Sequence, residues 1–468
     1  MEAPVCIVAW NAPAPEAAFA RLQGRRGIFW LDSSLPSAAG RYSLMGCEPF
    51  MRFRARGRAC ELLDPERGGW REDHRDPLQA LEEALAMYQV SDDIDRPVPF
   101  CGGAVGYLGY DFGRPAAPRP GAAGGDAWDA HLAWHDAAAV WDHAQGRAWL
   151  VGAGWRRPAA EAVAELSGWL DGAAPPPALP PPPRAGLRGD FTRESYISAV
   201  AEVRTRIAAG EIYQMNLAQR FSCALAEPAP QLYRRLRALN PAPMGAYVEA
   251  GDCTVLSSSP ERFLSVNRGR IRAFPIKGTR ARGATTAEDE ARRRELTTSE
   301  KERAELLMIV DLLRNDLGRV CRFGSIRVRR LHDLETFATV HHLVGEVEGE
   351  LRPGVGAAEL LRAVFPGGSI TGAPKIRAMQ VIAEIEPVRR GVFSGSLGYW
   401  SACGRIDLSI AIRTIVCRPG EASFHVGAGI VWDSDPDLEY EETLAKGRAL
   451  LSALGGTAWP GGHRSGSA

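Results

Sequence analysis

The stretch DGAAPPPALPPPPRAGLRG, residues 171–189, divides the sequence into two parts of different character. Its density of proline favours extended polyproline II and excludes both a helix and a central strand. Nine of the twelve tryptophans precede it, whereas nearly all of the acidic and glycine-rich motifs follow it. We therefore expect a linker or surface crossover at 171–189, an N-terminal lobe at 1–170, a chemically active domain at 190–454 and a disordered tail at 455–468.

Length and composition limit the class of protein. A chain of 468 residues exceeds what one ordinary hydrophobic core supports, so we expect two lobes or one large composite α/β domain. Lys+Arg and Asp+Glu are both 56, and the formal charge of +0 gives no electrostatic case for binding nucleic acid or an anionic membrane. The nine cysteines lack CxxC spacing, which fits neither a disulfide framework nor a zinc site. Without a leader-like N-terminus or a long apolar run, we expect a cytoplasmic protein.

Hydrophobic periodicity predicts elements on both sides of the proline-rich stretch. Before it, we expect strands at 27–32, 42–46 and 148–151 and a helix at 77–88. After it, we expect helices at 191–209 (with Asp190 as N-cap), 295–317 and 438–453, and strands at 391–399, 406–417 and 423–431.

A lysine stands in the segment FPIKGTR, residues 274–280, which is otherwise suited to turning and ligand binding. The proline before Lys277 presets φ, and the glycine after it permits close approach of the backbone to a ligand. A lysine attacks only as the free amine, so burial or cations such as Arg280 and Arg282 must favour its neutral form. Lys277 is therefore a candidate nucleophile, and the alternative is a solvated lysine after a strand.

Two acidic pairs lie on predicted helices. Glu302 and Glu305 are three residues apart, as are Glu439 and Glu442, so each pair shares one helix face. Two such helices facing each other would gather four carboxylates, which repel one another unless a cation lies between them. Mg2+ suits a few carboxylates together with water and an anionic ligand. The pairs therefore predict a magnesium site, and the alternative for each is a solvated helix face.

Two glycine-rich segments indicate anion binding. FPGGSITGAPK (365–375) leads into a helix, and Gly427 and Gly429 lie in a predicted strand. Glycine lets backbone N–H groups approach an anion, and a helix N-terminus adds partial positive charge. Arg413 would add a bidentate clamp, and Lys446, one turn after the second acidic pair, a point charge. The alternative for each glycine is a tight turn, and neither segment matches a nucleotide-binding template.

Nine motifs, in this order, resemble those of the chorismate-utilising enzymes. They are SSSPERF (257–263), FPIKGTR (274–280), ELLMIVDLLRNDLGRV (305–320), VHHLVG (340–345), FPGGSITGAPKIRAM (365–379), GSLGYW (395–400), AIRTI (411–415), GAGIV (427–431) and EYEET (439–443). The first 170 residues resemble the family more loosely, through GIFWLDSS, GRYSLMGCEP and FCGGAVGYLGYD. The resemblance implies an α/β (α+β) composite fold like that of anthranilate synthase component I, with two large sheets packed as a sandwich and helices outside.

Two positions distinguish subgroups of this family, which comprises anthranilate synthase component I, aminodeoxychorismate synthase component I, isochorismate synthases and salicylate synthases. Gln214 stands where the last two carry a lysine that activates water, and a glutamine amide cannot serve as a base. Lys277 stands where anthranilate synthases typically have alanine. The sequence PIKGT thus resembles aminodeoxychorismate synthase component I, which implies conversion of chorismate and ammonia to 4-amino-4-deoxychorismate, in 4-aminobenzoate and folate biosynthesis.

The same resemblance assigns roles to individual residues. The catalytic matches are Lys277, as the covalent nucleophile at ring C2, Glu261, as acid and base at the C4 oxygen, and His342. The metal-binding matches are Glu305 and Glu442, with Glu302 and Glu439 behind them, holding Mg2+. The substrate-binding matches are Arg413, Lys446, Gly427, Gly429, Ser369 and Gln214. For His341, beside the matched imidazole, we expect simple packing.

The resemblance also implies a second pocket and a partner. Family members hold tryptophan away from the active site, and the matching residues here are Ser33, Gly40, Arg41, Tyr42, Pro243, Met244 and Gly245. Met244 and Gly245 depart from the family pattern, so a tryptophan site and plain interface packing both stay open. Ammonia is expected from a separate glutamine amidotransferase. The alternatives for the whole chain are anthranilate synthase component I, which releases pyruvate and forms an aromatic ring, and a noncatalytic amino-acid-binding regulatory subunit.

Overall fold

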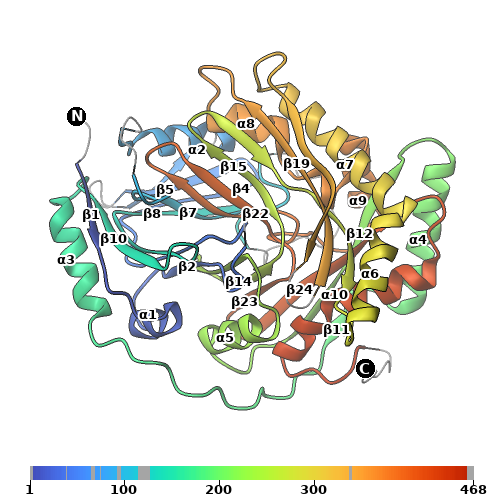
Figure 1. The fold of residues 1–468 in the computed structure, drawn as a ribbon, viewed down its shortest axis with the longest axis horizontal. Coiled ribbons are helices and arrows are strands. Elements are labelled where there is room, and N and C mark those ends of the chain that lie inside the picture. The colour runs from blue at the N-terminus through green and yellow to red at the C-terminus, as the bar shows by residue number, and fades with distance from the viewer. Residues whose placement is uncertain are drawn as a thin grey trace.

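Two large antiparallel sheets pack face to face, and helices cover their outer faces (Figure 1). The computed structural model describes residues 4–37, 39–64, 69–73, 75–91, 96–113, 127–336 and 340–460. In these residues each sheet has 12 strands. The predicted α/β sandwich with outer helices is therefore confirmed.

Both parts of the sequence contribute strands to both sheets. The first sheet runs β1 (Val5–Ala9), β10 (Arg147–Ala153), β9 (Ala137–Asp142), β3 (Tyr42–Gly46), β2 (Phe29–Asp32), β13 (Met244–Glu249), β14 (Thr254–Ser259), β23 (Thr414–Arg418), β24 (Glu421–Ile430), β12 (Gln214–Ala224) and β11 (Arg188–Gly189), with β20 (Gly372–Ala373) also on β12. The second runs β17 (Ile276–Ala281), β19 (Val340–Glu350), β16 (Arg270–Ala273), β15 (Arg262–Asn267), β22 (Ile406–Ile410), β21 (Ser396–Ser401), β7 (Gly103–Leu108), β8 (Ala130–His135), β4 (Met51–Arg56), β5 (Ala59–Asp64) and β6 (Gly69–Asp73), with β18 (Arg327–Thr336) also on β19. Because β2 pairs with β13 and β21 with β7, hydrogen bonds join the two parts within each sheet.

Apolar side chains fill three layers. The helices packed on the first sheet are α1 (Pro15–Leu22), α3 (Ala159–Leu170), α4 (Arg193–Ala208), α5 (Ala229–Leu239), α9 (Lys375–Ile385) and α10 (Pro436–Ala453). Those on the second are α2 (Pro77–Ala86), α6 (Thr286–Thr298), α7 (Glu300–Gly318) and α8 (Ala357–Val364). Between the sheets, Phe29 and Val248 of the first lie in clusters with Val105 and Leu397 of the second. Burying each such side chain stabilises the fold by about 1.5–3 kcal/mol.

Two helices of the structure differ from the predicted ones in where they begin or in their continuity. The helix predicted at 191–209 starts at Arg193, and its N-cap is Thr192, which forms a capping box with Ser195. Asp190, the predicted cap, instead binds Arg220 at 2.7 Å. The single helix predicted at 295–317 is interrupted at Ser299, whose ψ of 109° ends α6 and whose side chain caps α7.

The strand predicted at 406–417 is two strands in different sheets. β22 belongs to the second sheet and β23 to the first, and the chain crosses between them through Arg413, whose φ is +52°. A left-handed conformation is costly for a residue with a Cβ, so surrounding contacts must hold it. The strand predicted at 391–399 begins only at Ser396, after a turn. The other predicted elements are present with small shifts at their ends.

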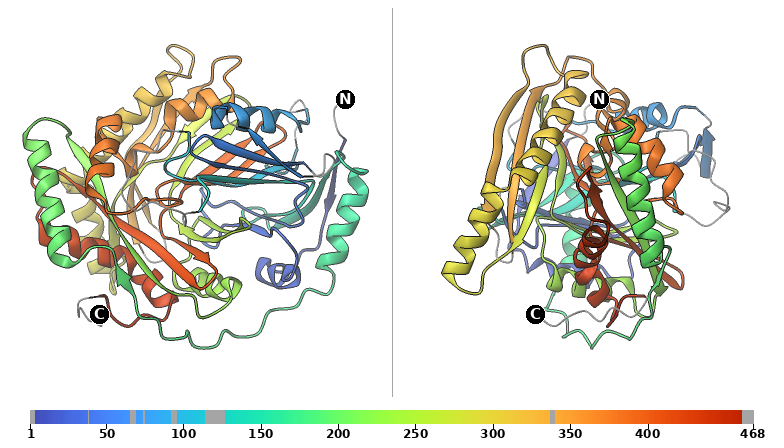
Figure 2. Two further views of the ribbon diagram at one scale, coloured as in Figure 1. Left: turned by 180° about the vertical axis from the view of Figure 1, so that it is seen from behind. Right: turned by 90° about the vertical axis from the view of Figure 1, so that its right-hand side faces the viewer.

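The proline-rich stretch crosses the outside of the molecule as an extended segment between α3 and β11 (Figures 1 and 2). Arg234 and Arg235 of α5 donate to the carbonyls of Pro177 and Pro180. The tail predicted to be disordered is ordered at least as far as residue 460, because Trp459 packs on Phe221 of β12. Residues 461–468 lie outside the described part. Among described helices, none is long and apolar enough to cross a membrane.

Candidate active site

Lys277 lies between the two sheets, at the edge of the second. Its Nζ is 3.5 Å from Glu305 Oε2 on α7, and these side chains are only 15% and 14% exposed. On the other side, a Cβ built on Gly429 of β24 would lie 3.5 Å from the same nitrogen. The solvated-lysine alternative is therefore wrong, because the amine faces a carboxylate and a glycine strand.

A bulge in β17 aims Lys277. The pairing of β17 with β19 shifts register between Lys277 and Thr279, and Gly278 has φ of +69°. A Cβ on Gly278 would lie 2.6 Å from Leu296 and 3.1 Å from Glu302 Oε2. Only glycine meets both demands, so the residue after the lysine fixes how closely α6 and α7 approach.

Glu261 is a buried carboxyl at the end of the β14–β15 connection. Burial raises its pKa to about 7, although a hydrogen bond from Ser369 and the positive charge of Lys277 oppose this rise. Ser369 Oγ donates to Glu261 Oε1 at 2.8 Å, so the glycine-rich segment 365–375 reaches the carboxyl directly. A carboxyl with a pKa near neutrality can both give and take a proton in one reaction.

His342 and Arg413 supply a neutral ring and a positive charge. Burial and the Arg413 charge lower the pKa of His342 to about 4, and Thr279 Oγ1 lies 2.9 Å from its Nδ1. The imidazole is therefore neutral at pH 7. Burial lowers the pKa of Arg413, and the guanidinium has no anionic partner among the described residues. A desolvated, unpaired arginine in a left-handed backbone suits an anionic ligand.

The predicted binding residues of the first sheet also meet here. Gln214 is 3% exposed, and a Cβ on Gly429 would lie 2.8 Å from its Nε2. Lys446 of α10 donates to the Gly427 carbonyl at 3.0 Å and pairs with Glu442 at 2.6 Å. Side chains from β12 and β17 lie against Gly427 and Gly429, so a larger residue at either position would collide with them. Both glycines lie within a strand, and the tight-turn alternative is wrong for both.

Each carboxylate of the two acidic pairs is held by a cation. The pairs are Glu302 with Arg280 at 3.4 Å, Glu305 with Lys277 at 3.5 Å, Glu439 with Lys301 at 3.9 Å and Glu442 with Lys446 at 2.6 Å. Burial opposes ionisation of Glu442, but Lys446, Lys277 and Lys301 outweigh it and hold its pKa below the usual range. Lys277 therefore acts electrostatically on carboxylates of both acidic pairs, Glu305 on α7 and Glu442 on α10. In the described part of the chain, however, no three carboxylate, imidazole or thiol groups converge as a metal site.

Most of the residues that the resemblance assigns to a second pocket do line a pocket in the structure. It has an empty volume of about 470 Å³, including space open to solvent, and lies between the sheets. Its lining includes Ser33, Ala39, Tyr42, Pro243, Met244 and Gly245 from the first sheet, and Arg262, Tyr399 and Asp407 from the second. Gly40 packs behind it, since a Cβ there would lie 2.9 Å from Pro243, and Arg41 points away to Asp142 at 2.7 Å.

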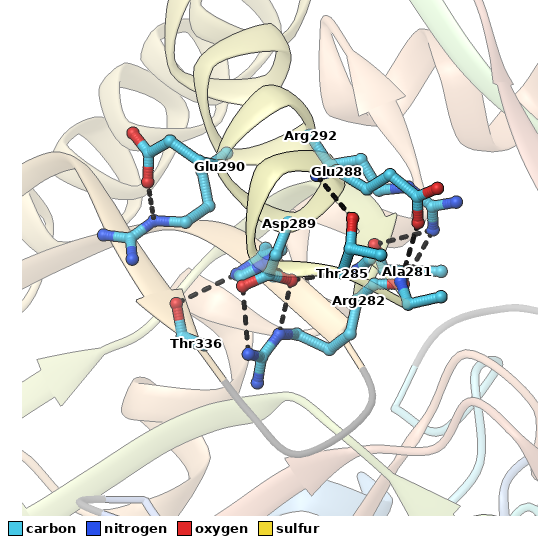
Figure 3. A network of polar contacts seen from close by, with 12 residues as sticks. Ala281, Arg282, Thr285, Glu288, Asp289, Glu290, Arg292 and Thr336 are labelled. Carbon is cyan, nitrogen blue, oxygen red and sulfur yellow. Dashed lines mark hydrogen bonds and ion pairs between the residues drawn. The ribbon is translucent and has the colours of Figure 1, made fainter.

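His341 does more than the simple packing expected for it. It is fully buried, and its ring nitrogens lie 2.9 Å from Thr336 Oγ1 and 2.9 Å from Asp289 Oδ1. Asp289 also accepts from Arg282 at 2.7 Å, as Figure 3 shows. This network fastens α6 across β17 and β19, beside Lys277.

Two further residues of the site have no signal in the sequence pattern. Arg390 is 2% exposed and pairs with Glu386 at 2.6 Å. It donates to the carbonyl oxygens of Ile370 and Asn216, both at 2.7 Å. Arg390 therefore joins the segment that carries Ser369 to the strand that begins with Gln214. The two carbonyl partners lie 20 and 174 residues away in the sequence, so the pattern of a single sequence does not reveal them.

Comparisons with known proteins agree on a single family. Residues 29–452 match the model of the chorismate binding enzymes. Aminodeoxychorismate synthase component 1 of Klebsiella aerogenes is 37% identical over 95% of this chain and 97% of its own length. Anthranilate synthase component 1 of Streptomyces coelicolor is 40% identical over 95% of this chain and 87% of its own. The crystal structure of anthranilate synthase component I from Streptococcus pneumoniae superposes with a TM-score of 0.77, at 30% identity, over 95% of this chain and 98% of its own.

Proposed function

The chain belongs to the family of chorismate binding enzymes, and on this premise we propose that it is the large subunit of an aminodeoxychorismate synthase. It would convert chorismate and ammonia to 4-amino-4-deoxychorismate. Relatives that carry either name are similarly close, so the choice rests on one observation. Lys277 places a mostly buried amine beside Glu305 and Gly429, where a covalent route needs a nucleophile.

In the first displacement, Lys277 Nζ forms a bond to ring C2. The ring double bonds shift, and the C4–O bond breaks. Glu261 gives its proton to the departing hydroxyl, which leaves as water. The pKa of about 7 keeps a useful fraction of Glu261 protonated at neutral pH.

In the second displacement, ammonia forms the C4–N bond, the double bonds shift back, and the C2–N bond breaks. The Lys277 amine leaves with the electron pair. Glu261, now a carboxylate, takes a proton from the attacking nitrogen, so its charge returns to the starting state. The enolpyruvyl group stays on the product.

Substrate binding would use the positive groups around this point. Arg413 and Lys446, with the backbone of Gly427 and Gly429, would hold the carboxylates of chorismate. Neutral His342, held by Thr279, can contact the substrate without adding charge.

The two acidic pairs fit Mg2+ in donor chemistry, because α7 and α10 each offer two carboxylates, whose lysine and arginine partners a divalent cation would displace. We propose that Glu305 and Glu442 hold the ion, with Glu302 and Glu439 behind them. When bound, it would neutralise these carboxylates and bind the ring carboxylate of the substrate. We further propose that a separate glutamine amidotransferase supplies the ammonia, which the name "component 1" of several relatives supports. The second pocket would take tryptophan.

Anthranilate synthase component I is the second candidate, because a relative of that name is 40% identical and the superposed structure carries that name. One experiment separates the two. The purified chain is incubated with chorismate, ammonium and Mg2+, and the products are resolved by liquid chromatography with mass detection. We expect 4-amino-4-deoxychorismate without pyruvate. Anthranilate in equal amount to pyruvate would contradict the proposal, and no turnover would favour a noncatalytic subunit.

A further inference from the structure

Asn216 lies two residues after Gln214 on β12, so their side chains point to the same face of the first sheet. Met215 and Leu217, which alternate with them along the strand, are fully buried in the core between the first sheet and its helices. Gln214 and Asn216 therefore face the second sheet, on the side where Lys277 lies.

The backbone of Asn216 is fixed on both sides. Its N–H donates to the Thr371 carbonyl at 2.8 Å, and its own carbonyl accepts from Arg390 at 2.7 Å. Arg390 is itself buried and paired with Glu386. The backbone that carries the Asn216 side chain is thus fixed before any ligand binds, as a binding group requires.

The amide oxygens of both side chains are buried, and neither accepts a hydrogen bond from the described residues. Buried acceptors without a donor are rare in native proteins and indicate a missing partner. A Cβ on Gly427 would lie 2.6 Å from Asn216 Oδ1, and one on Gly429 would lie 2.8 Å from Gln214 Nε2 and 3.5 Å from Lys277 Nζ. The two glycines keep the space beside both amides and the amine clear of side chains.

An amide oxygen accepts N–H or O–H and repels the carboxylates of chorismate. We propose that Asn216, with Gln214 beside it, binds the ammonia that attacks C4. This inference rests on the proposed function. As the C4–N bond forms and the C2–N bond to Lys277 breaks, positive charge develops on the attacking nitrogen until Glu261 takes its proton. Acceptors fixed beside that nitrogen stabilise the charge.

The test uses the two half-reactions separately. Asn216→Leu keeps the branching at Cγ and removes the acceptor. We expect its KM for ammonium to rise about tenfold or more, since bound ammonia loses one fixed hydrogen-bond acceptor. Its KM for chorismate, and the rate at which chorismate forms a covalent adduct without ammonia, should stay within about twofold of the wild type. Asn216→Ala, which removes the acceptor without adding bulk, should show the same split if the leucine variant does not fold.

Gln219→Leu is the matched control, because Gln219 lies on the same strand but faces α10, where it donates to Thr443 at 2.6 Å. Its KM for ammonium should match the wild type. Slower adduct formation or a higher KM for chorismate in the Asn216 variants would show that Asn216 binds the C4 hydroxyl instead, and would overturn the inference. An unchanged KM for ammonium would also overturn it. If the wild type forms no adduct at all, the proposed function fails instead.

Discussion

Lys277 Nζ and Glu305 Oε2 lie 3.5 Å apart, so the candidate nucleophile is bound to a candidate metal ligand. The charge that holds the lysine is the charge that would hold Mg2+. If Mg2+ binds Glu305 as we propose, it would compete with Lys277 for one carboxylate and would release the amine toward the substrate.

Lys277→Ala should lower kcat by about 100-fold or more, because the covalent route loses its nucleophile. Chorismate binding, which we assign to Arg413 and Lys446, should change by no more than about threefold. Steady-state kinetics and equilibrium titration with chorismate measure the two effects. Lys277→Arg is the control for charge, since it keeps the ion pair with Glu305 but cannot act as an amine nucleophile. Normal turnover by either variant would show that Lys277 is not the nucleophile and has only a structural role.

The pH dependence of adduct formation should follow Glu261. We propose that its protonated form acts in the first step, so the rate should fall as pH rises through about 7. Ser369→Ala removes a hydrogen bond that favours the ionised carboxyl, so it should move this fall to higher pH. Rapid-quench measurements across pH would show the shift. Identical pH profiles for wild type and Ser369→Ala would show that the Ser369 hydrogen bond does not influence the pKa of Glu261.

Glu261 should also make the fold less stable as pH rises. Its pKa is about 7 in the folded chain and 4.5 as a free side chain, so the native state binds the extra proton between these values. The free energy of unfolding contributed by this group is therefore full below pH 4.5 and declines up to about pH 7. Compared with wild type, Glu261→Gln should gain relative stability from pH 5 to pH 8 in urea unfolding. A constant difference between the two proteins would contradict this.

Elements with local signals could be predicted from the sequence, and so could the residues of the site that carry chemical groups. β24 and α10 follow apolar periodicity, and the lysine, carboxylates and glycines stand in recognisable motifs. The crossover at Arg413 could not be predicted, because its left-handed backbone is imposed by contacts on both sides rather than by residue type. The role of Arg390 could not be predicted for a related reason, because its partner Asn216 lies 174 residues away in the sequence.

Removal of metal should abolish activity, because the ring carboxylate of the substrate would lose the cation proposed to bind it beside Glu305 and Glu442. EDTA should stop turnover and Mg2+ should restore it. Glu305→Gln and Glu442→Gln should raise the Mg2+ concentration needed for half-maximal rate by about tenfold or more, and Glu302→Gln and Glu439→Gln by less. Full activity in EDTA, or an equally small effect at all four positions, would show that these glutamates form ion pairs and do not bind a metal.

Gly429→Ala should damage the site more than the fold. The added Cβ meets Gln214 Nε2 at 2.8 Å and Lys277 Nζ at 3.5 Å, which are ends of flexible side chains. We expect kcat/KM for chorismate to fall about tenfold or more, with little change in melting temperature. Gly168→Ala on α3 is the control, since nothing lies within 4 Å of its Cβ, and it should be neutral or slightly stabilising. Equal activity of the two variants would remove Gly429 from the site.

Trapping of the covalent intermediate tests the central claim most directly. Wild-type protein is mixed with chorismate and Mg2+ without ammonia, quenched in acid and measured by intact-protein mass spectrometry. The account predicts an added mass equal to chorismate minus water, located on the peptide that contains Lys277 and lacking in Lys277→Arg. Absence of the adduct in wild-type protein that turns over normally with ammonium would contradict it.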